Sequence, residues 1–290
     1  MGVVIMDKRL LMPTGQLLSG NLVTEFLNWQ KSNQYAGKLF SIMGDSICTL
    51  EGYNPIGYRV FFKGKKCEKS GVREPLDTWW GKAVDYLGGI VLVNNSWSGS
   101  RASKLQELDT QFPSGCSAQR TNGLHKGKRT PDVIWIYMGT NDWEQSVPMG
   151  YPIEEANDEK FAFAYQLMID RIKRNYPKAE IWCCTITRAY RSKDKKFHFP
   201  VHYSGQTMDS YNQVIKEIAK SKNCRVIDFA GFHEEYDSID GSHPTIDGMN
   251  TLAKFVIQTL ADDDGKEFLS RGEEVRKASG MLEKIKNFFK

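Results

Sequence analysis

The chain has 290 residues, a formal net charge of +4 and six cysteines. Hydrophobic residues make up 40% of it and charged residues 26%, which is ordinary for a soluble globular protein and excludes collagen-like and disordered classes. Lys and Arg are spread along the chain, apart from residues 63–69 and 188–196. A mild charge distributed in this way predicts no nucleic-acid partner.

The N-terminal residues lack the basic start, long apolar core and cleavage site of a secretory signal. No apolar run approaches the length that spans a membrane, so no membrane span is expected. None of the cysteines forms a C-x-x-C pair, so we expect buried free thiols in a reducing compartment. These features favour a cytoplasmic protein, and a secreted chain that has lost its signal is the alternative.

Strands and helices are expected to alternate along most of the chain. Residues 1–36 contain one short amphipathic stretch, at 22–29, and no motif. Short apolar runs then predict strands at residues 39–43, 90–94, 133–138, 180–185 and 225–228. Helical patterns lie at residues 75–87, 158–176, 207–221 and 245–260. Such alternation predicts an α/β domain with a parallel sheet and right-handed crossovers.

Four short motifs lie beside these expected elements. In chain order they are Gly44-Asp45-Ser46, the segment 94–99 that ends at Gly99, Gly139-Thr140-Asn141-Asp142, and Asp240-Gly241-Ser242-His243-Pro244. The first three follow strands and the fourth opens the last helix. Open α/β sheets place their functional sites at the carboxyl ends of strands, so we expect the motifs to meet there.

The first and last motifs contain the groups that a serine hydrolase needs. A serine hydroxyl is a weak nucleophile and requires a base within hydrogen-bonding distance. His243 is the candidate base for Ser46, and Asp240, three residues earlier, is the candidate that orients the imidazole. Asp45 and Asp142 are expected to brace the turns that carry their neighbours.

The four motifs together resemble those of the SGNH/GDSL hydrolase superfamily, and the resemblance covers roughly residues 38–260. It implies a three-layer α/β/α, flavodoxin-like fold with a five-stranded parallel sheet. It also implies a serine-dependent carboxylic ester hydrolase without metal or organic cofactor. The implied oxyanion hole consists of the backbone N–H groups of Ser46 and Gly99 and the side-chain amide of Asn141. No Gly-x-Ser-x-Gly elbow occurs, so an α/β-hydrolase has little support.

Two features depart from the family pattern. Ser96 stands where the second block often has a glycine, and residues 64–74 form a long polar insert. We expect the insert to be a surface loop, with a lid over the site as the alternative. The implied organisation is an N-terminal extension at 1–37, a hydrolase domain at 38–261 and a C-terminal helical tail at 262–290.

Other side chains near the motifs suggest what the site contacts. Trp97 and Trp143 adjoin motif residues and are candidate substrate contacts, because sugars stack on such rings. His198 and His202 are four residues apart, but Pro200 argues against the helix that would pair them as metal ligands. We therefore expect no metal site.

The expected substrate is a small-molecule or saccharide ester with a short acyl group, such as an acetylated carbohydrate. A lysophospholipase or thioesterase acting on long acyl chains is an alternative, and a non-catalytic carbohydrate-binding relic of the fold is another. In the tail, Val275, Ala278, Leu282, Ile285 and Phe289 recur at helical spacing and predict an amphipathic helix. Its apolar face would dock on its own domain, form a homo-oligomer contact or lie on a membrane surface.

Overall fold

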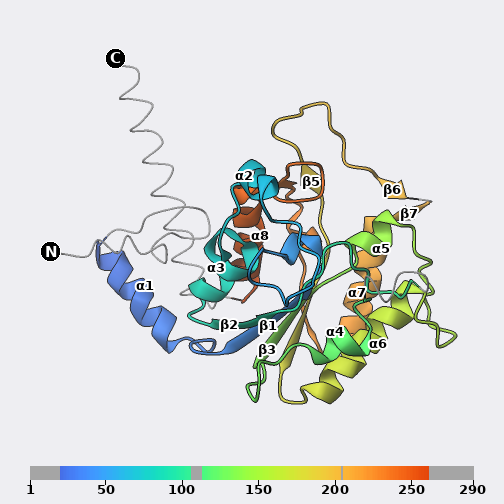
Figure 1. Ribbon diagram of the computed structural model, residues 1–290, viewed down its shortest axis with the longest axis horizontal. Helices are drawn as coiled ribbons and strands as arrows, with labels where there is room; N and C mark the ends of the chain where they lie inside the picture. Colours follow the sequence, from blue (N-terminus) through green and yellow to red (C-terminus); the bar gives the residue numbers. More distant parts are fainter. Residues whose placement is uncertain (1–19, 106–112, 204, 261–290) are drawn as a thin grey trace.

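The computed structural model describes residues 20–105, 113–203 and 205–260. Its centre is one parallel sheet of five strands in the order β2-β1-β3-β4-β8 (Figure 1). The strands are β1 (Leu39–Gly44), β2 (Ile90–Asn94), β3 (Val133–Tyr137), β4 (Glu180–Cys184) and β8 (Arg225–Ile227). This order and the parallel pairing confirm the expected flavodoxin-like α/β fold.

Helices cover both faces of the sheet (Figure 1). On one side lie α1 (Gly20–Ser32), α3 (Trp79–Tyr86) and α8 (Ile246–Leu260), and on the other lie α4 (Ala118–Asn122), α6 (Phe161–Asn175) and α7 (Met208–Ser221). Two short helices, α2 (Lys65–Ser70) and α5 (Thr140–Glu144), and the 3-10 turn η2 (Ser46–Cys48) lie in loops beside the sheet. Two small ladders join β5 (Ala189–Tyr190) to β9 (Tyr236–Asp237) and β6 (His202–Tyr203) to β7 (Gln206–Thr207).

Two expected elements differ from the structure. The helix expected at residues 75–87 is a 3-10 turn, η3 (Pro75–Asp77), followed by α3. Thr78 separates them because its backbone is extended and its hydroxyl caps α3 by accepting the N–H of Gly81 at 3.0 Å. The polar insert at residues 64–74 is not wholly a loop, since it contains α2.

Large aromatic side chains form the centre of the core. Phe40 of β1 contacts Trp135 of β3 edge to face with ring centroids 5.1 Å apart, and Trp135 stacks on Trp182 of β4 at 5.7 Å. Trp79 of α3 stacks on the same Trp135 at 5.6 Å. All four rings are fully buried. Such pairs add to the free energy gained from burial and fix the strands that carry the motifs.

Helix α1, which falls in the expected N-terminal extension, is part of this core. Phe26 and Trp29 of α1 are buried and pack on Tyr86 of α3, with ring centroids 5.0 and 5.2 Å away.

All six cysteines are free thiols, four of them buried and two partly buried. The tail at 262–290 lies outside the described residues, and none of the described helices is long and apolar enough to cross a membrane.

Candidate active site

Ser46 follows the carboxyl end of β1, which lies between β2 and the central strand β3, and it begins the turn η2. Asp45 caps this turn, because its side chain accepts the N–H of Ile47 at 2.9 Å. The turn therefore places the Ser46 side chain beyond the carboxyl end of the sheet, where 7% of the residue is exposed. The expected bracing role of Asp45 is confirmed by this hydrogen bond.

His243 reaches Ser46 from the segment before α8. The two residues are 197 positions apart in the sequence, and His243 Nε2 lies 2.8 Å from Ser46 Oγ. On the other side of the ring, His243 Nδ1 lies 3.0 Å from Asp240 Oδ2 and 3.1 Å from Oδ1. Asp240 also accepts the backbone N–H groups of Ser242 and His243, which holds its carboxylate against the imidazole. The structure thus brings these three sequence-predicted residues into one hydrogen-bonded chain.

Carboxyl groups near the imidazole differ in their ionisation. Partial burial opposes the ionisation of Asp240, but the hydrogen bonds and charge of His243 outweigh it and lower the Asp240 pKa to about 2. Burial raises the pKa of Glu144 at the end of α5, despite the charge of His243 nearby. Asp240 is therefore the carboxylate that stays ionised beside the ring across the neutral range.

The loop after β2 and the helix after β3 lie at the same edge of the sheet as Ser46. Gly99 has a φ of +84°, a left-handed conformation that suits glycine. Asn141 Nδ2 donates to the carbonyl of Ser100 at 3.0 Å, and the buried Asp142 accepts the N–H groups of Ala102 and Ser103 at 2.8 and 3.0 Å. These bonds confirm Asp142 as a brace and keep the Asn141 amide beside the Gly99 loop.

Asn141→Ala is expected to lower kcat by a factor of about 10²–10³ and to change KM little, as for loss of one oxyanion donor. The amide would act on charge that forms only in the transition state, so binding of the ground-state ester does not need it. Steady-state kinetics on a soluble acetate ester measures both constants, with Asn28→Ala on the exposed face of α1 as the matched control. A change in KM alone would show that Asn141 binds the ground-state substrate.

Asp45 is wholly buried, and burial raises its pKa to about 7, although the N–H of Ile47 partly offsets this. The folded protein then holds the Asp45 proton more tightly than the unfolded chain does. The free energy of unfolding must therefore fall as the pH rises from about 3.8 to about 7, and this contribution is constant above that range.

Asp45→Asn keeps an oxygen for the N–H of Ile47 and removes the charge. Between pH 5 and pH 8 we expect the wild-type protein to lose up to roughly 3 kcal/mol more stability than the variant. Urea unfolding of both proteins at the two pH values measures this difference. Other buried carboxyls, such as Asp142, are common to both proteins and cancel. Equal pH dependence of the two proteins would contradict the role given to Asp45.

Two residues that the sequence analysis did not identify shape the site. The guanidinium of Arg120 is fully buried and donates to the carbonyl of Gly44 at 2.9 Å, the carbonyl of Asn95 at 3.1 Å and the hydroxyl of Ser100 at 2.7 Å. It therefore joins the end of β1 to the loop after β2. Phe61 stacks on His243 with ring centroids 3.3 Å apart and planes within 3°.

The two candidate tryptophans are less accessible than expected. Trp143 is 1% exposed, because Phe199 stacks on it at 5.4 Å and Tyr203 packs edge-on at 4.7 Å. A substrate contact of Trp143 stays a prediction. Trp97 is 8% exposed and is covered by Tyr58, whose ring centroid lies 4.3 Å away. A substrate contact of Trp97 stays a prediction.

The histidine pair lies in the connection between β5 and β7. His198 is exposed in a loop and His202 begins the short strand β6, so the two do not share a helix. Within residues 20–105, 113–203 and 205–260, no three His, Cys, Asp or Glu side chains gather as a metal site would require.

Comparison with known proteins assigns the family. A family model described as GDSL-like lipase/acylhydrolase matches residues 38–260. The chain belongs to this family. Membership implies ester hydrolase activity, and it confirms the resemblance that the four motifs indicated.

Individual relatives of this GDSL-like chain are distant. The cellulase/esterase CelE of Acetivibrio thermocellus is 40% identical over 57 residues, which are 20% of this chain and 6% of that protein. A protein named as a GDSL-like lipase from Bacteroides uniformis superposes with a TM-score of 0.60 at 22% identity, over 78% of this chain and 96% of its own. Est24, a carbohydrate acetylesterase from Sinorhizobium meliloti, superposes with a TM-score of 0.54 at 15% identity, over 77% of this chain and 99% of its own. The two structures establish the fold alone.

Proposed function

We propose that the protein is a serine ester hydrolase that removes a short acyl group, such as acetyl, from a carbohydrate. The observation that carries this proposal is the chain from Ser46 Oγ through His243 to Asp240, with contacts of 2.8 and 3.0 Å. Its order and spacing are those of a nucleophile, a base and a carboxylate that fixes the base.

In the proposed reaction, Ser46 Oγ attacks the ester carbonyl while His243 Nε2 accepts its proton. The N–H groups of Ser46 and Gly99 and the Asn141 amide stabilise the tetrahedral oxyanion. The intermediate collapses when His243 returns the proton to the departing alcohol. Water, activated by the same imidazole, then releases the acyl group from Ser46. Asp240 stays ionised and stabilises the positive charge that His243 carries between the two proton transfers.

The residues around Ser46, His243 and Asp240 support a carbohydrate ester with a short acyl group. Phe61 stacks directly on His243, and Tyr58 covers Trp97 beside the Gly99 loop. Flat aromatic rings suit a sugar, whereas a long acyl chain needs a deep aliphatic slot. The limited likeness to the CelE protein, which its name describes as a cellulase and esterase, agrees with a carbohydrate ester.

Initial rates on p-nitrophenyl esters from acetyl to decanoyl test the acyl preference. We expect kcat/KM to be highest for acetyl or propionyl and to fall by about tenfold or more by octanoyl, since each unaccommodated methylene loses binding energy. An acetylated xylo-oligosaccharide, followed by release of acetate, tests the leaving group in parallel. Rates that rise steadily to decanoyl would instead support a lipase or thioesterase acting on long chains.

A further inference from the structure

Positive charge is concentrated in two short segments of the chain. Residues 59–73 contain six basic and one acidic side chains, and residues 191–196 contain four basic and one acidic. Together these two basic segments carry a net charge of +8, while the whole chain carries +4. The remainder of the protein is therefore net negative by four charges, so the segments differ in sign from the rest of the molecule.

The first basic segment lies beside both His243 and the Gly99 loop. Phe61 stacks on His243, and Lys66 Nζ lies over the same Phe61 ring at 4.7 Å from its centroid. On the oxyanion side, a Cβ placed on Gly99 would lie 3.8 Å from Nη1 of Arg59. One cation of this segment is thus near the imidazole and another is near the glycine loop.

The second basic segment lies against the turn that carries His243. The Phe197 ring packs so closely on Gly241 that an added Cβ would lie 2.5 Å from it, and Arg191 lies over that ring at 5.7 Å. Ser192 donates through its N–H and its hydroxyl to Asp237, just before the turn, at 2.8 and 3.0 Å. The segment is therefore fixed beside the candidate base.

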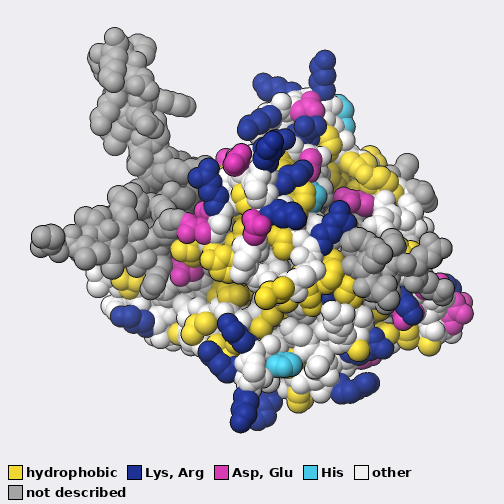
Figure 2. Space-filling model, in the orientation of Figure 1, with side chains coloured by type: hydrophobic (Ala, Val, Ile, Leu, Met, Phe, Trp, Pro, Cys, Tyr) yellow, Lys and Arg dark blue, Asp and Glu magenta, His cyan; other side chains and the backbone are white. Residues whose placement is uncertain are grey.

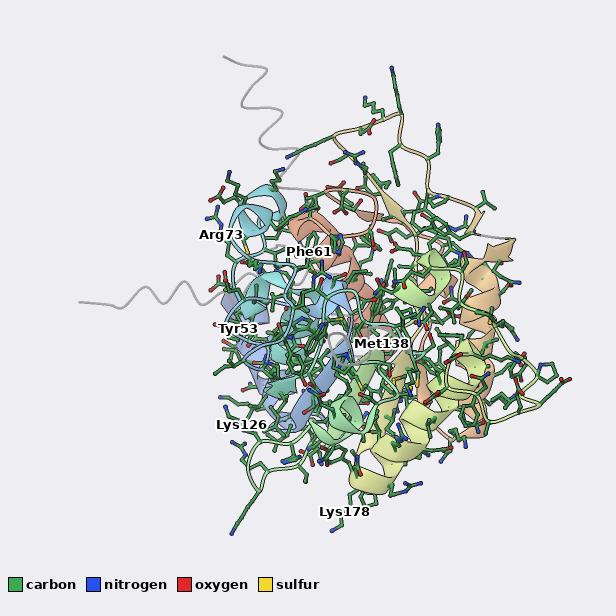
Figure 3. All side chains as sticks on the ribbon, turned by 45° about the vertical axis from the view of Figure 1, so that its right-hand side comes forward. Tyr53, Phe61, Arg73, Lys126, Met138 and Lys178 are labelled. Carbon is green, nitrogen blue, oxygen red and sulfur yellow. The ribbon has the colours of Figure 1, made fainter. Side chains whose placement is uncertain are left out.

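Most cations of the two segments are available to a ligand. The exposed lysines are Lys63, Lys65, Lys66, Lys69, Lys193, Lys195 and Lys196, and no acidic side chain in the described parts of the chain forms an ion pair with them. Figure 2 shows Lys and Arg side chains gathered on the upper part of the molecule, over α2 and the connection from β5 to β6. Figure 3 places Phe61 and Arg73 on that side and Lys126 and Lys178 at the opposite end.

We propose that the ester hydrolysed at this site is carried by an acidic saccharide, whose carboxylate or sulfate groups bind the two basic segments. This inference rests on the proposed ester hydrolase function. A net positive rim raises the local concentration of an anionic substrate and its rate of encounter, and salt screens that effect. The exposed side chains of α2 and of residues 191–196 are all polar or charged, which suits a solvated polyanion better than insertion into a lipid surface.

The first test compares an acetylated uronic-acid oligosaccharide with an acetylated xylo-oligosaccharide and with p-nitrophenyl acetate. At about 20 mM ionic strength, where the Debye length exceeds 20 Å, we expect kcat/KM for the uronic-acid substrate to exceed that for the neutral saccharide by about tenfold or more. The advantage should disappear near 0.5 M NaCl. An acidic saccharide that reacts no faster than the neutral one at low salt would overturn the inference.

The second test reverses charge with a matched control. The variant K193E/K195E/K196E alters one basic segment. K126E/K128E/K178E makes the same change in net charge with exposed lysines at the opposite end, where Figure 3 labels Lys126 and Lys178 and where Lys128 lies in the turn closed by the bridge from Lys126 to Arg129. The first should lose about tenfold or more in kcat/KM on the uronic-acid substrate and far less on p-nitrophenyl acetate, while the second should change little on either. Equal losses in the two variants would show a net-charge effect and overturn the proposal.

Two further results separate this inference from its alternatives. Turnover of p-nitrophenyl acetate that requires Ser46, without a preference for the acidic saccharide, would leave the proposed hydrolase intact and reject only the inference. No Ser46-dependent turnover of any ester would reject both. Tight binding to vesicles that contain phosphatidylserine, lost in Ile56→Ser at a fully exposed apolar side chain, would assign the basic surface to a membrane instead.

Discussion

Ser46→Ala is expected to lower kcat by a factor of about 10⁴–10⁶ and to leave the fold intact. The hydroxyl lies 2.8 Å from His243 Nε2, so its removal takes away the proposed nucleophile and the proton that the imidazole would accept. The backbone of η2 loses nothing, because the cap of that turn comes from Asp45 rather than from the Ser46 side chain. Hydrolysis of p-nitrophenyl acetate and the melting temperature measure the two parts of the prediction.

A serine-reactive fluorophosphonate gives an independent readout of the same residue. We expect it to label the wild-type protein at Ser46 and to label the alanine variant not at all. Ser221→Ala, at an exposed serine at the end of α7, is the matched control and should keep both labelling and rate. A folded Ser46→Ala protein with near-wild-type activity would reject the assigned nucleophile, and a wild-type protein that resists labelling would favour a non-catalytic relic of the fold.

Asp240→Asn is expected to lower kcat by a factor of about 10⁴, because it changes the tautomer of His243. The amide oxygen can still accept the N–H groups of Ser242 and His243, as Asp240 Oδ1 does at 3.2 and 2.9 Å. The amide nitrogen, however, would donate to His243 Nδ1. The proton would then move to Nε2, and the ring could no longer accept a proton from Ser46.

The measurement for Asp240→Asn is kcat on an acetate ester, accompanied by a thermal unfolding curve. Asp247→Asn, on an exposed residue of the first turn of α8, is the control for loss of one carboxylate in this region. A fall in rate that tracks a fall in melting temperature would mean that Asp240 acts through the fold. A folded variant with nearly full rate would remove Asp240 from the proposed mechanism.

The elements that fix the fold were predictable because each produces a local signal. The buried strands are unbroken apolar runs, and all five expected strands match the structure to within one residue at each end. The motifs mark where those strands end, so the meeting of Ser46, Asp240 and His243 followed from the topology. The break at Thr78 was missed because a threonine in a helical pattern does not reveal whether its hydroxyl caps a new helix.

The remaining site residues gave no local signal. Arg120 lies on a five-residue helix in a polar stretch, and only tertiary contacts reveal that its guanidinium joins Gly44 to the loop after β2. Phe61 and Phe62 form an apolar pair like many others in the sequence. The stacking of Phe61 on His243 depends on the path of the loop that carries it, which the sequence does not reveal. The cover over Trp143 gave no local signal either, since Tyr203 and Gln206, which contact it, come from a distant hairpin.

The distance of 197 positions between Ser46 and His243 has a consequence for how the protein matures. Contacts between residues far apart in sequence form late, because closing such long loops costs chain entropy before any favourable interaction is gained. Ser46 follows the first strand of the sheet along the chain, and His243 follows the last. A nascent chain that ends before residue 240 therefore contains the proposed nucleophile without its proposed base, so the proposed hydrolytic activity requires synthesis and folding of almost the whole domain.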